Sequence, residues 1–341
     1  MPRSSLPYLP TEKPWYSLVA LTLMVGASPA QAPSPPPPHI VFILADDLGW
    51  TDLSTGRTNG GNGSPYHKTP NLDALAAAGA CFTNAYSNGS NCAPTRAALW
   101  SGQWAARTGV YTVGTGNRGK PEFRKLDAAA NQVTLAPSSV TLAETMQAAG
   151  YATAHFGKWH MGNEDRGASP TDQGFDHQAG GDKRGGVGRA GNFADQDGAF
   201  GIPGLPANGK AKQFMADRLT DEAVQWMRSA RKPIFCCISH YSVHTPIAAP
   251  PSDLAATPKA EPGSRHSHRR YAAMMKNLDD NCGRVMKFLA ETADPLREGQ
   301  KLLSNTVIVF TSDNGGLGGF RGPGMSGRQE ITNQLPLRAG K

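Results

Sequence analysis

The sequence has few cysteines, and their arrangement excludes two common structural roles. Five cysteines occur in 341 residues, an odd number with no C-x-x-C pair. This pattern argues against a disulfide framework and against a structural zinc site. The cysteines are Cys81, Cys92, Cys236, Cys237 and Cys282.

Basic runs interleaved with aromatic residues are also absent, so the sequence does not indicate a nucleic-acid-binding protein. The formal net charge of +7 nevertheless favours anionic partners of other kinds. The length and the 39% hydrophobic content suffice for a globular chain that buries a substantial core.

Long hydrophobic runs are missing except near the N-terminus. The apolar stretch 17–27 follows Arg3 and Lys13, is too short to span a bilayer comfortably, and precedes an Ala30-Gln31-Ala32 cleavage pattern. We therefore predict a signal peptide over 1–32, a stiff Pro-rich linker over 33–38 and a folded domain over 39–341. The product is expected to be secreted or periplasmic, with no membrane attachment after cleavage.

Apolar strand patterns alternate with amphipathic helix patterns along the rest of the chain. This alternation predicts an α/β fold with a mostly parallel or mixed sheet and helices on both faces. A further short strand is expected over 81–86. The main strands are expected at 39–44, 151–156, 234–239 and 306–311, and the helices at 70–79, 92–102, 142–150, 214–228 and 271–293.

Each of the four main strands runs directly into polar side chains. Because ligand sites of open α/β sheets lie beyond the carboxyl ends of the strands, these side chains are expected to converge on one cleft. The oxygen donors among them suit a hard cation, Ca²⁺ or Mg²⁺, and the nitrogen donors suit an oxyanion. The oxygen donors are Asp46, Asp47, Asp313 and Asn314; the nitrogen donors are Lys158, His160 and His244.

The stretch 91–102 predicts a nucleophile at a helix start. Pro94 suits the first turn of a helix and Gly102 suits its end, which places Cys92 at the N-terminus where anions are favoured. Arg96 lies one turn further on the same face. Read alone, the stretch is better explained as a buried free cysteine at the start of an ordinary helix, because short motifs match by chance.

Several motifs together give the chain a family resemblance. Cys92-Ala93-Pro94-Thr95-Arg96 resembles the C-x-P-x-R signature of the type I, formylglycine-dependent sulfatases. The segments T-P-N-L-D before it, and G-K-W-H, D-N-G-G and 337–341 after it, are similar to further sulfatase motifs in the same order. The resemblance implies the alkaline-phosphatase-like fold and hydrolysis of an aryl or carbohydrate sulfate ester.

The resemblance also implies roles for individual residues. Cys92 would be oxidised to formylglycine by a formylglycine-generating enzyme, and one Ca²⁺ would be held by the modified Cys92 with the four oxygen donors, Asp46, Asp47, Asp313 and Asn314. Arg96 would steady the aldehyde hydrate, while Lys158 and His160 would bind it and the sulfate. His244 or Lys341 would supply a proton to the departing alcohol.

Two departures from the family pattern are visible. Gln103 stands where the family usually has an arginine after Ser-Gly. The family's smaller C-terminal subdomain would follow Lys341, so 39–341 corresponds to a truncated catalytic domain. We expect residues 1–341 alone to be poorly soluble or nearly inactive.

Three alternatives remain at this level. The same fold and modified cysteine also support phosphoester or phosphonate monoester hydrolysis, and a non-catalytic binder of sulfated glycans would keep the same site. A cofactor-free cysteine hydrolase is a weaker idea, because nearby carboxylates would raise the pKa of the thiol. The loops 51–68 and 180–209 are expected to set substrate specificity.

The signature around Cys92 generates a first prediction. Expressed in a host that converts other sulfatases, Cys92 should carry formylglycine, which peptide mass spectrometry detects directly. An unmodified thiol in that host, beside a converted control sulfatase, would contradict the assignment.

Overall fold

The computed structural model describes residues 35–117, 119–187, 191–261, 264–318, 330–338 and 340–341. The predicted signal peptide, 1–32, lies outside the described residues, and the described part of the Pro-rich linker, 35–38, has no regular structure. Residues 36–341 form one compact unit, which holds every helix and strand in the described part of the chain.

The core of this unit is a five-stranded sheet in the order β3-β2-β4-β1-β5. All paired strands are parallel, so the sheet is not mixed. The strands are β1 (His39–Ala45), β2 (Ala152–Gly157), β3 (His177–Ala179), β4 (Ile234–Ser239) and β5 (Thr306–Ser312).

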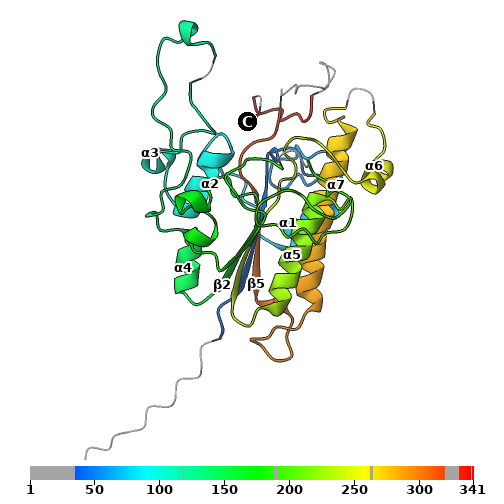
Figure 1. The fold of residues 1–341 in the computed structure, drawn as a ribbon. Helices are drawn as coiled ribbons and strands as arrows, with labels where there is room; N and C mark the ends of the chain where they lie inside the picture. The colour runs from blue at the N-terminus through cyan, green and yellow to red at the C-terminus, as the bar shows by residue number, and fades with distance from the viewer. Residues whose placement is uncertain (1–34, 118, 188–190, 262–263, 319–329, 339) are drawn as a thin grey trace, which may run out of the picture. The chain divides into compact units, whose positions relative to one another are not determined.

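Two groups of helices cover the sheet, as the sequence predicts for a parallel sheet. In Figure 1, α2 and α4 lie on one side and α5 and α7 on the other. The first group comprises α2 (Cys92–Ser101), α3 (Ala105–Thr108) and α4 (Leu142–Ala148). The second comprises α1 (Pro70–Ala78), α5 (Met215–Ser229), α6 (Pro251–Ala256) and α7 (Arg269–Glu291). Short 3₁₀ turns occupy 121–123, 164–166, 171–173 and 302–305.

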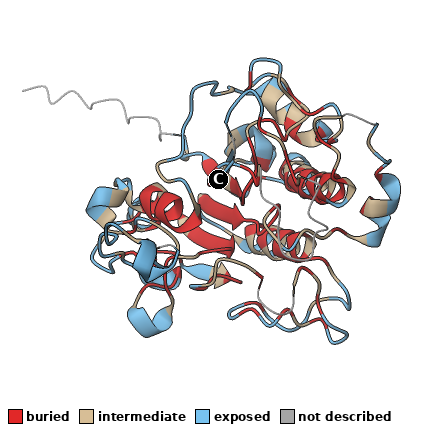
Figure 2. Cartoon of the chain, turned by 90° about the horizontal axis from the view of Figure 1, so that it is seen from above, coloured by how far each residue is buried: buried red, intermediate tan, exposed pale blue. Residues whose placement is uncertain are grey.

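Strand alternation divides the core between the two faces. On β4, Ile234, Cys236 and Ile238 pack in the cluster shared with α5 and α7, whereas Phe235 and Cys237 join the cluster around Trp100 of α2. Figure 2 shows the buried residues concentrated in the sheet and on the helices. Within the described residues, no helix has the length and apolar character needed to cross a bilayer.

Most expected elements are confirmed; one expected strand is absent, and the helices α3 and α6 and the strand β3 were not expected. Residues 81–86 form turns and irregular backbone instead of a strand. The three-residue strand β3 was not expected; it pairs with β2 through the register His177–Ala154 and Ala179–Phe156. A three-residue strand has too little alternation to stand out in a sequence.

The predicted start and end of the helix at Cys92 are confirmed. The helix begins at Cys92, and Pro94 stands in its first turn, where a missing N–H is tolerated. Gly102 closes it in the left-handed region, with φ of 65°, and its N–H donates to Ala98 O over 2.8 Å. This geometry places the Cys92 side chain at the helix start.

Candidate active site

The carboxyl ends of β1 and β5 bring three carboxylates together. Asp46 and Asp47 follow β1, and Asp313 follows β5, whose register pairs Ala45 with Ser312. The N–H of Asp47 donates to Asp313 Oδ1 over 3.2 Å. All three residues are fully buried, so their charges depend on protein partners rather than on water.

Two buried cations lie among these carboxylates. Arg96 Nε donates to Asp313 Oδ2 over 3.0 Å, and Arg96 Nη1 donates to the carbonyl of Lys158 over 2.5 Å. Lys158 Nζ in turn donates to Asp46 Oδ2 over 2.6 Å. Arg96 and Lys158 are fully buried, so α2 and the end of β2 are tied to the ends of β1 and β5 by charge.

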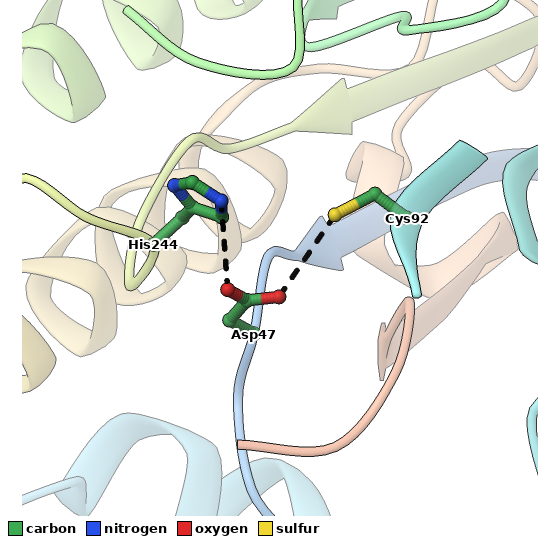
Figure 3. A group of neighbouring side chains, drawn as sticks. All are labelled: Asp47, Cys92 and His244. Atoms are coloured by element: carbon green, nitrogen blue, oxygen red, sulfur yellow. Dashed lines mark hydrogen bonds and ion pairs between the residues drawn. The ribbon is translucent and has the colours of Figure 1, made fainter. Parts of the chain in front are cut away.

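Cys92 faces the same carboxylates. Its Sγ lies 3.5 Å from Asp46 Oδ1 and 3.9 Å from Asp47 Oδ1. Figure 3 shows Asp47 between Cys92 and His244, with one carboxylate oxygen toward each. His244 Nε2 lies 3.6 Å from Asp47 Oδ2. Two overlapping clusters of metal-ligating types result, Asp47–Cys92–His244 and Asp46–Cys92–Asp313.

Lys341 and Asn314 complete the arrangement around Asp47. Lys341 Nζ lies 2.5 Å from Asp47 Oδ1 and 3.3 Å from Cys92 Sγ. Asn314 Nδ2 donates to the same Asp47 oxygen over 2.7 Å. Every residue of the predicted cation set therefore lies in this cluster.

His160 takes part less directly. Its N–H donates to Asp182 O over 2.9 Å, and its ring packs so tightly on Gly185 that a Cβ there would lie 2.3 Å from Cε1. The Nδ1 atom is buried without a hydrogen-bond partner. Burial, followed by the charges of Lys158 and Arg96, lowers the pKa of His160 to about 3, so the imidazole is neutral at pH 7.

Burial and neighbouring charges set the pKa values of the carboxylates in the cluster. Burial raises the pKa of Asp46 to about 8; Lys158 and Arg96 oppose the rise, and Asp313 and Asp47 add to it. Burial also raises the pKa of Asp313, but Arg96 and Lys158 outweigh it and hold that pKa at about 2. A bound cation would favour the charged form of Asp46.

The Cys92 thiol is held in its protonated form. Burial, with a further contribution from Asp46, raises its pKa to about 12 against the opposing effect of Lys158. Since a thiolate is the reactive form of cysteine, this environment argues against a hydrolase that uses the unmodified thiol as nucleophile.

Two residues at the strand ends adopt left-handed backbone, which is uncommon for side-chain-bearing residues. Asp47 has φ of 59° and His160 has φ of 66°. Such strain persists where the surroundings impose it and is frequent at functional sites. Both residues belong to the set predicted from the sequence.

A cavity of about 370 Å³ opens onto the cluster. Three predicted residues, Asp47, His244 and Lys341, line it, while Cys92, Arg96 and Lys158 are buried. Four lining residues were not predicted. They are Ser90, Asn91, Thr245 and Leu317. Each is a neighbour of a predicted residue or motif, but nothing in its own type indicates a ligand contact.

Asn91 shows why these residues escape sequence analysis. It is the N-cap of α2, but its side chain makes no capping hydrogen bond; Nδ2 bonds to Thr112 Oγ1 over 3.0 Å and Oδ1 is left without a partner. Asparagine is a preferred N-cap residue, so its position in the sequence predicts a capping role. In the folded chain, the Asn91 side chain bonds to Thr112 instead of to the backbone of its own helix.

Comparisons with known proteins give a matching family model and several similar chains. The family model described as Sulfatase matches residues 38–339. A sulfatase from Formosa agariphila is 36% identical, with 89% of this chain and 60% of the relative covered. Mouse N-acetylgalactosamine-6-sulfatase is 30% identical, with 87% and 55% covered. This chain thus spans between half and two thirds of the length of these relatives.

A solved structure gives the same result at the level of the fold. The structure of Ps i-CgsB in complex with k-i-k-neocarrahexaose matches with a TM-score of 0.65 and 27% identity, covering 89% of this chain and 62% of the other. The match confirms the sulfatase fold expected from the sequence.

The buried ion pair between Arg96 and Asp313 generates a stability prediction. Arg96→Met should lower the free energy of unfolding by about 3–5 kcal/mol, because it leaves a buried carboxylate uncompensated. The pKa of Asp313 lies below its ordinary value of 3.8, so the pair stabilises the fold above that pH and the contribution is lost as pH falls through about 2.

Urea denaturation of the metal-free protein at several pH values measures this effect. The deficit of Arg96→Met should shrink toward low pH. Arg231→Met is the control, since Arg231 is exposed and donates to nearby backbone carbonyls; its effect should stay within about 0.5 kcal/mol. Equal effects of the two substitutions would contradict the prediction.

Proposed function

This chain belongs to the sulfatase family, and on that basis we propose that it hydrolyses a sulfate ester to an alcohol and inorganic sulfate. The observation that carries the proposal is the meeting of Cys92, two buried cations and three buried carboxylates where three parallel strands end. Such a cluster provides donors for a sulfuryl group and oxygen ligands for a cation in one place.

The residues present fit a hard divalent cation. Asp47 Oδ2 and Asn314 Oδ1 are buried and have no hydrogen-bond donor, so both oxygens keep lone pairs free for a ligand. The raised pKa of Asp46 points the same way. Asp46, Asp47, Asp313 and Asn314 would hold one Ca²⁺ together with the modified Cys92, and the cation would act as a Lewis acid on a sulfate oxygen.

Cys92 would act after conversion to formylglycine. In this structure the unmodified thiol occupies the place of the converted side chain. The converted side chain supplies an oxygen nucleophile at sulfur, so the chemistry does not need a thiolate. A formylglycine-generating enzyme is therefore a proposed partner of the chain, and a secreted or periplasmic location is proposed with it.

Arg96 and Lys158 would fix the reacting group from the protein side. Each is held by a carboxylate, Arg96 by Asp313 and Lys158 by Asp46. Fixed donors need no reorganisation during the reaction, which is what makes them effective in stabilising developing charge. Neutral His160, with an unpartnered Nδ1, would add a hydrogen bond to the same group.

The leaving alcohol would depart toward the cavity. His244 and Lys341 both line it and are the two candidates to assist the departing oxygen. His244 donates through Nδ1 to Thr245 O over 2.6 Å, which directs Nε2 toward Asp47, so Nε2 would carry a proton for the leaving oxygen only in the imidazolium form, and burial lowers the pKa of His244. Burial lowers the pKa of Lys341, but Asp47 and Cys92 outweigh burial and raise it, so its ammonium is charged at pH 7.

A carbohydrate sulfate ester is the proposed natural substrate class. Two comparisons support this class: relatives include proteins named N-acetylgalactosamine-6-sulfatase, and one similar structure is a complex with k-i-k-neocarrahexaose. Parallel assays with aryl sulfate, aryl phosphate and phosphonate esters separate sulfatase activity from the phosphoester alternative. Binding of a sulfated sugar without turnover by the converted protein would favour the non-catalytic alternative.

The cation site generates a prediction about binding. Asp313→Ala should abolish stoichiometric Ca²⁺ binding and turnover, because it removes a ligand and releases Arg96. Asp294→Ala is a matched control: Asp294 is also a buried carboxylate, but it pairs with His39 at the other end of β1. Isothermal titration calorimetry measures Ca²⁺ binding, and stoichiometric zinc or full activity after exhaustive chelation would count against the site.

The two candidates for leaving-group assistance can be told apart. Removing a proton donor should slow the release of a poor leaving group, such as a sugar alcohol, by about 100-fold or more, and that of 4-nitrophenol much less. We expect this pattern for His244→Ala or for Lys341→Met. Measuring kcat for both substrate classes identifies which residue is the proton donor. If both variants lose kcat equally on both classes, neither residue assists the leaving group.

A further inference from the structure

One buried carboxylate outside the catalytic cluster joins two distant parts of the chain. Asp52 is fully buried in the loop that follows Asp46 and Asp47. Its Oδ2 accepts hydrogen bonds from the Gly49 N–H over 2.8 Å and from Tyr271 Oη over 2.7 Å. Its Oδ1 accepts from Thr332 Oγ1, a residue 280 positions later.

The segment around Thr332 is fixed to this loop by several further bonds. Gln334 Nε2 donates to Asp52 Oδ1 over 3.3 Å and to Thr332 Oγ1 over 3.0 Å. Gln334 Oε1 accepts from the Thr51 N–H over 3.1 Å, and Thr51 Oγ1 donates to the carbonyl of Asn333 over 2.7 Å. These hydrogen bonds fix residues 332–334 in space relative to Asp52.

Close packing connects Gln334 to Lys341 through Gly316. A Cβ at Gly49 would lie 2.1 Å from Gln334 Nε2, and a Cβ at Gly316 would lie 2.9 Å from the same atom. Gly316 O in turn accepts the N–H of Lys341 over 2.8 Å, and a Cβ at Gly340 would lie 2.4 Å from that oxygen. Gln334 and Lys341 are therefore connected by close contacts at these glycines, so a shift of Gln334 would displace Lys341.

We infer that Asp52, acting through Thr332 and Gln334, is a positioning residue that holds the Lys341 ammonium against Asp47 and Cys92. The flexible four-carbon stem of lysine does not fix its ammonium by itself. Asp47 and Asp52 share one loop. Asp52 therefore helps to fix the position of both partners of the Lys341–Asp47 contact. The catalytic meaning of this contact rests on the proposed function, whereas its geometry does not.

Amine labelling of the metal-free protein tests the geometry without any turnover. Thr332→Val removes the donor at nearly constant size, and acylation of Lys341, read by peptide mass spectrometry, should then rise about tenfold, as expected for losing a hydrogen bond to a charged group. Lys287, whose side chain is 74% exposed, serves as the internal reference. Thr332→Ser keeps the hydroxyl and should keep Lys341 protected.

A control variant separates positioning from general loss of stability. Thr220→Val removes another buried threonine hydroxyl, which donates to Ala216 O within α5, and should leave Lys341 labelling unchanged. Asp52→Asn provides a second test of the same contact. Labelling of Lys341 that stays low in both Thr332→Val and Asp52→Asn, or rises equally in Thr220→Val, would overturn the inference.

A double-mutant cycle on aryl sulfate turnover then tests the functional link. Thr332→Val should lower kcat in the parent protein but have no further effect in a Lys341→Met background, because both changes act on one ammonium. Additive effects would refute positioning through Lys341. If the converted parent protein has no turnover, the outcome expected of residues 1–341 alone, the cycle does not bear on the proposed function and the labelling result by itself decides the inference.

Discussion

The structure depends on holding three buried carboxylates close together. Asp46, Asp47 and Asp313 are fully buried where β1 and β5 end, and ionised carboxylates in such a place are costly unless they are paired. Arg96 pairs with Asp313, Lys158 with Asp46 and Lys341 with Asp47, and each cation reaches the cluster from a different segment of the chain. The position of α2, the end of β2 and the loop after β1 are thereby fixed to one another by the same charges that the proposed chemistry uses.

Parallel strand order creates the place where this can happen. Because β1 lies between β4 and β5, the residues that follow these strands meet at one edge of the sheet, and α2 directs Cys92 to the same edge. The left-handed backbone of Asp47 and His160 shows that the surroundings impose local conformations there. Ion pairs, the proposed cation site and strained backbone thus lie in one small region.

The fold class, most of its elements and the charged residues that gather in the candidate site could be predicted from the sequence, whereas the cavity-lining Ser90, Asn91, Thr245 and Leu317 could not. Runs of branched apolar residues define the buried strands, and Pro94 and Gly102 define the helix that begins at Cys92, since these signals are local. The polar residues after each strand were expected to meet because strand ends in a parallel sheet share one edge. The short strand β3 and the irregular segment 81–86 were missed, since their conformations follow from neighbours rather than from their own pattern.

What the sequence by itself determined was which residue types stand at the strand ends and at the helix start. Only the tertiary structure decided how they pair: that Arg96 contacts Asp313 and Lys158 contacts Asp46, that Asn91 turns to Thr112 instead of capping its helix, and that Asp52 bonds to Thr332. The reason is physical. A strand or a helix cap is set by neighbouring residues, whereas a buried polar group takes whichever partner the packing of distant segments brings within hydrogen-bonding distance.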